Sequence, residues 1–162
     1  MNQDQAKIIY QQLIELWKQF CERHSDLFNL AVDEYQCLLA SDMDQLNVIL
    51  DQKNELLHEI SNIENERQRI LNKVQELTQV KMDKIYDLIT YLENEYGLSH
   101  HLERYNETLI EIIEKIQMQN KKNQLFLNKA LLNISQLKKE FALSKKSVET
   151  YNRQGEKVTS AR

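Results

Sequence analysis

LLASDMDQL, residues 38–46, is the clearest interruption in a chain whose apolar residues otherwise follow helical spacing. Ser41 can act as the N-cap of a following helix, with Asp44 as its capping-box partner, and Asp42 is the competing cap. Acidic side chains here also suit the positive end of a helix dipole. We therefore predict that the chain turns back at residues 40–43 and forms an antiparallel helical hairpin.

Long helices are predicted on both sides of this turn. The first spans residues 3–39, and its apolar face is wide, which indicates packing against two neighbours. The second runs from the turn to residue 77 and has a narrower seam. Near-heptad spacing along that seam is typical of a coiled coil.

Two further helices are predicted downstream. A bend near 78–82 leads into a short helix that ends at Gly97 in a left-handed C-cap. Ser99 can cap the last long helix, which spans residues 100–143. The core stripe predicted for that helix is Leu102, Tyr105 or Asn106, Leu109, Ile112, Ile113, Ile116, Leu127, Ala130, Leu131, Ile134, Leu137 and Phe141.

The composition supports an all-α fold. The chain has no proline and two glycines, whereas strand proteins need frequent turns that draw on both. We predict an antiparallel helical bundle or coiled coil of three long helices plus one short helix. Its domains are a helical bundle at 1–143 and a flexible polar tail at 144–162, since the tail has low hydrophobicity and no periodicity.

Charge and cysteine content restrict the class of protein. The net charge is −4, and the excess of basic residues lies in the tail, so the acidic body argues against nucleic acid as a partner. No signal peptide and no apolar run of ~20 residues is present, so we expect no membrane insertion. Cys21 and Cys37 lie ~24 Å apart on one helix, too far for a disulfide within it. Two isolated cysteines suit a reducing cytoplasm.

Catalytic and metal-binding motifs are missing from the sequence. Two distant glycines cannot form a phosphate-binding loop. One Glu-x-x-His occurs at Glu55–His58, but a dimetal bundle needs two such motifs and two further glutamates. His24 falls on the apolar stripe of the first helix, which favours a packing role. We therefore expect no enzyme activity, no metal and no cofactor.

A second apolar face on the last helix is the sharpest functional signal. Met118, Leu125 and Leu132 are spaced by seven and lie opposite the core stripe. A bundle core cannot use both faces unless another segment covers the second one. Three covers remain open: the short helix, a second copy of the chain, or an amphipathic helix of a partner laid in a groove.

Polar residues interrupt the core spacing of the same helix. Asn120 and Asn123 can fix the register of the helices, as a buried asparagine does in coiled coils. Alternatively, Asn120, Asn123 and Gln124 can form hydrogen bonds with a bound partner segment. Both interpretations remain open at this stage.

The order of these elements resembles the FlgN-type flagellar export chaperones over most of residues 35–155. The similarity rests on a tyrosine and a leucine pair, an acidic turn, and a spaced series of Lys, Leu, Leu, Ile, Glu and Arg in the second helix. Further matching residues lie in the last helix and in the tail. These are Tyr35, Leu38, Leu39, Asp42, Leu46, Lys53, Leu56, Leu57, Ile60, Glu64 and Arg67, then Asn120, Asn123, Gln124 and Leu127, then Tyr151, Asn152, Arg153, Gln154 and Gly155.

This resemblance implies a cytoplasmic chaperone of the hook–filament junction proteins, which binds their C-terminal helical segments and delivers them to the export gate. The implied client-binding residues are Met118, Asn120, Asn123, Gln124, Leu125 and Leu132. Tyr151 and Gly155 would serve docking to the export gate. The alternative function is a self-associating structural coiled coil, in which the second face forms a homodimer.

Overall fold

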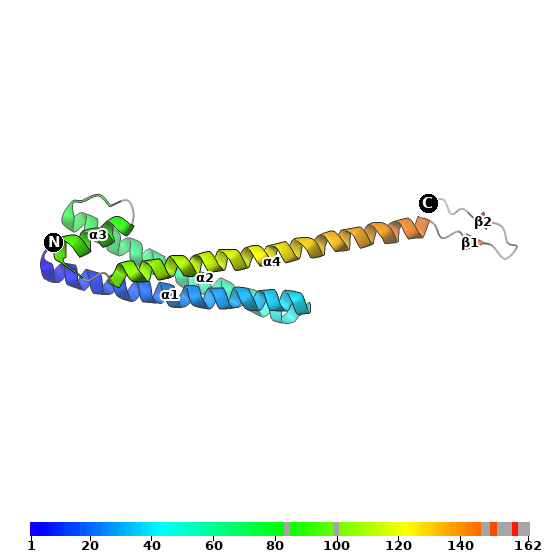
Figure 1. Ribbon diagram of the computed structural model, residues 1–162, viewed down its shortest axis with the longest axis horizontal. Coiled ribbons are helices and arrows are strands. Elements are labelled where there is room, and N and C mark those ends of the chain that lie inside the picture. Colours follow the sequence, from blue (N-terminus) through cyan, green and yellow to red (C-terminus); the bar gives the residue numbers. More distant parts are fainter. Residues whose placement is uncertain (83–84, 99–100, 147–149, 152–156, 159–162) are drawn as a thin grey trace. The chain divides into compact units, whose positions relative to one another are not determined.

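A computed structural model describes residues 1–82, 85–98, 101–146, 150–151 and 157–158. The elements in chain order are α1 (Gln3–Ala40), α2 (Met43–Thr78), α3 (Ile85–Tyr96), α4 (His101–Lys146), β1 (Thr150–Tyr151) and β2 (Lys157–Val158) (Figure 1). The chain divides into a first unit, Met1–Asn123, and a second unit, Gln124–Arg162. The all-α class with three long helices and one short helix is confirmed.

The hairpin between α1 and α2 forms where the sequence predicts it. Ser41 ends α1 with a left-handed backbone (φ 57°), and its N–H group bonds the Leu38 carbonyl at 3.3 Å. Asp42, the competing cap, is the actual N-cap of α2, because its carboxylate accepts from the Gln45 N–H at 3.0 Å. Asp44 lies in the first turn of α2, where the helix dipole favours it.

The second predicted break is also confirmed. Gln79 ends α2 with a left-handed backbone (φ 57°), within the predicted bend. Gly97 follows α3 at φ +63°, a conformation that a side chain would strain. Ser99, the predicted cap of the last helix, lies outside the described residues.

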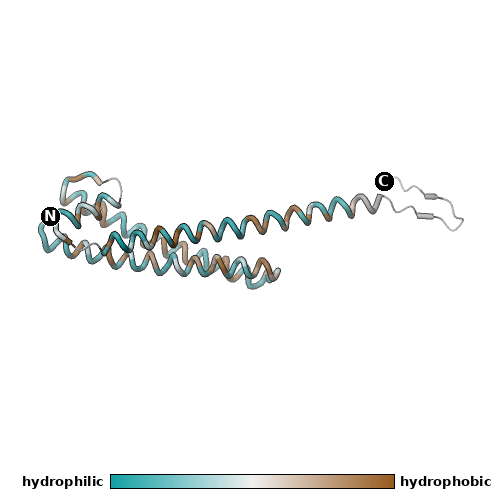
Figure 2. Tube along the Cα trace, viewed as in Figure 1, coloured by the Kyte–Doolittle hydropathy of each residue, from teal (hydrophilic) through white to brown (hydrophobic). Residues whose placement is uncertain are grey.

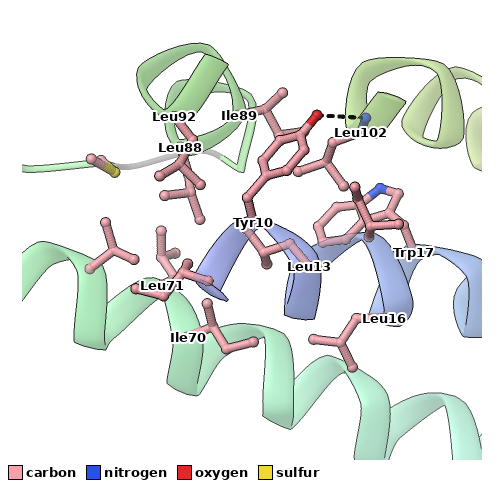
Figure 3. Close-up of a cluster of buried hydrophobic side chains, with 14 of the residues drawn as sticks. Tyr10, Leu13, Leu16, Trp17, Ile70, Leu71, Leu88, Ile89, Leu92 and Leu102 are labelled. Carbon is pink, nitrogen blue, oxygen red and sulfur yellow. Dashed lines mark hydrogen bonds between the residues drawn. The ribbon is translucent and has the colours of Figure 1, made fainter. Parts of the chain in front are cut away.

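The main hydrophobic core joins all four helices (Figure 3). Tyr10 and Trp17 of α1 lie among Ile70 and Leu71 of α2 and Leu102 of α4. The apolar face of α3 closes this cluster with Leu88, Ile89 and Leu92, which are fully or almost fully buried. Packing against α2, α3 and α4 at once explains the wide apolar face of α1.

Polar groups inside this core are paired. The Tyr10 hydroxyl donates to the Glu93 carboxylate at 2.9 Å and accepts the Leu102 N–H at 3.3 Å, the bond drawn in Figure 3. The Trp17 indole N–H donates to the Asn106 side-chain oxygen at 3.3 Å. These bonds fix α3 and the start of α4 against α1, because a buried polar group without a partner is costly.

A smaller cluster continues the three-helix packing within the first unit. It contains Leu27 of α1, Leu56 of α2 and Ile116 of α4. Beside it, Lys53 and Glu34 form a largely buried ion pair at 2.5 Å between α2 and α1. In the first unit, therefore, α4 runs parallel to α1 and antiparallel to α2.

The predicted core stripe of α4 is wrong in its second part. Leu102, Leu109 and Ile116 are buried as predicted. The later members are exposed, with exposed fractions between 41% and 69%: Leu127, Leu131, Ile134, Leu137 and Phe141. Helical periodicity shows that a helix has an apolar face, but it contains no information about which segment covers that face.

The region predicted as a tail is described only in part. Helix α4 continues to Lys146, past the predicted end at residue 143. Strands β1 and β2 pair antiparallel, with Thr150 opposite Val158 and Tyr151 opposite Lys157. The other residues after Lys146 lie outside the described part. In the described part of the chain, no helix combines the length and hydrophobicity needed to cross a bilayer.

Candidate functional site

The helical part of the second unit exposes a series of large apolar side chains. Hydrophobic positions recur along α4 in Figure 2. We call the series from Leu125 to Phe141 the apolar segment; its members are Leu125, Leu127, Leu131, Leu132, Ile134, Leu137 and Phe141. Large apolar side chains exposed along one segment in this way are typical of a binding site.

The apolar segment has two faces. Leu125 and Leu132 are seven residues apart, which places them within about 20° of each other around the helix. We call this pair the narrow face. The wide face, centred roughly 180° away, consists of Leu127, Leu131, Ile134, Leu137 and Phe141. A single flat neighbour cannot cover both faces of one helix.

The charges around these faces are almost all positive. Residues 124–146 contain five lysines and one acidic residue, Glu140, in a chain of net charge −4. Lys129, Lys138 and Lys139 are exposed and form no ion pair with any residue that the structure describes. In the first unit Lys18 pairs with Glu15 and Lys53 with Glu34, whereas Lys7, Lys73 and Lys115 are exposed and form no ion pair with a described residue.

The structure leaves most of the predicted client-binding side chains accessible. Met118 and Asn120 belong to the first unit, and Met118 is 74% exposed. The short helix α3 does not cover Met118, because its apolar side chains are buried in the core around Tyr10. Gln124, Leu125 and Leu132 belong to the second unit and are exposed, Leu125 at 52% and Leu132 at 64%.

Asn123 differs from the other predicted client-binding residues. Its side chain is 2% exposed, and its amide N–H donates to the Ala31 carbonyl at 2.9 Å. Its carbonyl oxygen accepts from the Gln119 amide, also at 2.9 Å. In this structure Asn123 fixes α4 against α1, so it sets the register of the two helices. This was one of the two roles that the sequence allowed. The proposed client-binding surface therefore does not include Asn123.

Sequence reasoning assigned several exposed residues to the core. Leu127, Leu131, Ile134, Leu137 and Phe141 were predicted to be buried, but they form the larger of the two exposed faces. The signal that could have separated them from core residues is charge. Only Glu140 is acidic in residues 124–146, whereas lysines of a packed bundle tend to have acidic neighbours on adjacent helices.

The residues predicted for docking to the export gate are only partly described. The backbone of Tyr151 lies in β1, opposite Lys157 of β2. Gly155 lies outside the described residues.

Among the described residues, the titratable groups with shifted pKa values belong to the packed first unit. Burial is the main cause that raises the pKa of Tyr10 and of the Cys21 thiol. The hydrogen bond that Arg67 donates to Glu64 raises the pKa of Arg67. His24 is half-buried and has its Nδ1 2.7 Å from the Phe20 carbonyl, so it packs within α1 as predicted. The pKa shifts of Tyr10, Cys21 and Arg67 follow from burial and hydrogen bonding in the packed helices.

Comparisons with known proteins add one finding. A family model described as FlgN protein matches residues 1–159. No curated protein and no solved structure matches the chain.

Proposed function

The chain belongs to the FlgN family of flagellar export chaperones, and from this premise we propose that it binds the C-terminal helical segments of hook–filament junction proteins and delivers them to the flagellar export gate. FlgN-family chaperones bind flagellar export substrates. The identity of the client and the delivery step are the proposed part. A binding role of this kind requires no catalytic group and no cofactor.

The observation that carries this proposal is the exposure of the apolar segment. Leu131 and Leu132 are adjacent leucines that belong to the two different faces, and their exposed fractions are 63% and 64%. An amphipathic client helix can bury such side chains by laying its own apolar positions against them. The chaperone would thereby shield client surface that otherwise causes premature association.

Reversible binding fits a surface of this size. Ordering a flexible client segment costs about 2–5 kcal/mol of the contact energy. One helix with an apolar face bordered by Lys129 and Lys139 therefore supports moderate affinity, which a protein that must release its client needs. A large dry interface would retain the client instead.

Other residues complete the proposal. Met118 and Asn120, exposed on the first unit, are proposed as further client contacts. Tyr151 and Gly155 are proposed to contact the export gate. We propose a cytoplasmic location, because the client must be held before export.

The test is a calorimetric titration of the full chain with the C-terminal peptide of a hook–filament junction protein. We expect saturable binding, together with no binding to the same junction protein when it lacks that segment. Equal binding of the complete and the truncated junction protein would contradict the proposal.

A self-associating coiled coil remains the alternative, since the same exposed leucines can meet in a homodimer. Sedimentation equilibrium of the full chain distinguishes the two functions. A monomer that binds the client supports the chaperone function, and a stable dimer that ignores the client supports the alternative.

A further inference from the structure

The lysines of the apolar segment indicate the charge of its partner. Lys129 and Lys139 lie about 40° to either side of the narrow face, and Lys138 lies at the wide face. All three are exposed without an ion pair in the described part of the chain. Long lysine side chains beside an apolar stripe favour carboxylates on the rim of the partner.

The opposed faces separate a protein partner from a membrane. A basic amphipathic helix that lies on a bilayer buries one face and keeps the other in water. Here such a position would bury either the narrow face or the wide face and leave leucines of the other in water. Two partner helices, one on each side, can cover both.

A second copy of the same segment is a poor occupant. Residues 124–146 carry five lysines and one glutamate. Two such segments laid together would bring like charges close to each other, which is destabilising. The occupant that fits is therefore acidic.

We propose that the apolar segment is held between two acidic amphipathic helices of its partner, one on the narrow face and one on the wide face, with partner carboxylates beside Lys129, Lys138 and Lys139. This inference rests on the proposed function, because it describes the chemistry of the client segment. It adds that the client supplies two helices rather than one, and that these helices are rich in glutamate or aspartate at their borders.

The experiment uses the full chain and two synthetic amphipathic peptides with identical leucine positions. One peptide has glutamate and the other lysine at the polar positions. We expect two molecules of the glutamate peptide to bind per chain, and the lysine peptide to bind at least tenfold more weakly. The affinity for the glutamate peptide should fall as NaCl rises from about 0.05 to about 0.5 M, because salt screens exposed charges.

Variants of the full chain test which face holds each peptide and whether the lysines contribute to binding. L125D/L132D should remove one peptide site, and L131D/I134D should remove the other. K129E/K138E/K139E should weaken binding of the glutamate peptide roughly tenfold or more, since three attractive charge pairs would become repulsive. The control K7E/K73E/K115E changes three exposed lysines of the first unit and should bind within about twofold of the parent chain.

Several results would overturn the inference. These are equal binding of both peptides, a single site per chain, or binding to phosphatidylserine vesicles through these lysines without binding of the peptide. If the junction protein binds but the glutamate peptide does not, the inference fails and the proposed function stands. If the glutamate peptide occupies both sites but the junction protein does not bind, the inference holds and the proposed client is wrong.

Discussion

Replacing Leu125 and Leu132 with aspartate should strongly weaken client binding and leave the fold intact. The two side chains are 52% and 64% exposed in the free chain. Complete burial of a leucine contributes about 1.5–3 kcal/mol, so a client that covers the exposed half gains roughly 1–1.5 kcal/mol from each. A carboxylate placed in the same contact adds a desolvation cost of about 1 kcal/mol or more. The pair should therefore cost about 4 kcal/mol of binding free energy, or roughly a thousandfold in Kd.

The assay is the calorimetric titration with the C-terminal peptide of a junction protein, combined with circular dichroism and thermal melting. Helicity and Tm should stay close to those of the parent chain, because neither leucine is buried. Ile8 (60% exposed) and Leu57 (48% exposed) in the first unit provide the matched control, I8D/L57D, which should bind the client normally. Unchanged binding by L125D/L132D would show that the narrow face is not a client contact. A collapse of the fold would show that this face belongs to the core.

Four further predictions concern the first unit. Tyr10→Phe removes one hydrogen bond to the buried Glu93 carboxylate and one from the Leu102 N–H, so the free energy of unfolding should fall by about 1–3 kcal/mol in urea denaturation. An unchanged midpoint would show that these bonds contribute nothing. Burial raises the pKa of Tyr10 above its ordinary value of 10.0, so its contribution to stability is complete below pH 10.0 and is lost as the pH rises through the folded-state pKa. The Tm should therefore fall in that alkaline range, and less so in the phenylalanine variant. Lys53→Met leaves Glu34 largely buried without its cation and should lower the free energy of unfolding by about 1–3 kcal/mol. The double variant K53M/E34M should recover most of that loss. A double variant that is no more stable than the single one would show that the ion pair does not account for the loss. Asn123→Ala breaks the hydrogen bond to the Ala31 carbonyl and should lower the free energy of unfolding by about 1–2 kcal/mol. The affinity for the client should change less than threefold. A large loss of affinity without loss of stability would show that Asn123 contacts the client.

Local signals in the sequence were sufficient to predict the fold. The turn at Ser41 and Asp42 combines a break in periodicity with capping side chains, and both halves of that signal are local. Gly97 similarly marks the end of α3, because glycine tolerates a positive φ. Such features depend on a few neighbouring residues, so a single sequence contains them.

Burial along α4 could not be predicted in the same way. The apolar spacing of the core stripe continues from Ile116 to Ile134, yet Ile116 is buried and Ile134 is 50% exposed. The difference depends on whether another segment lies against each residue, which is a property of tertiary packing. Asn123 illustrates the same limit, since only its contact with Ala31 decides between a packing role and a binding role.

Hydrogen–deuterium exchange of the full chain, measured with and without a junction protein, tests the central claim most directly. The free chain should exchange faster in residues 125–141 than in the α1–α2 hairpin, and addition of the client should slow exchange chiefly in that segment. Protection confined to α1, α2 or α3, with no change in 125–141, would contradict the account.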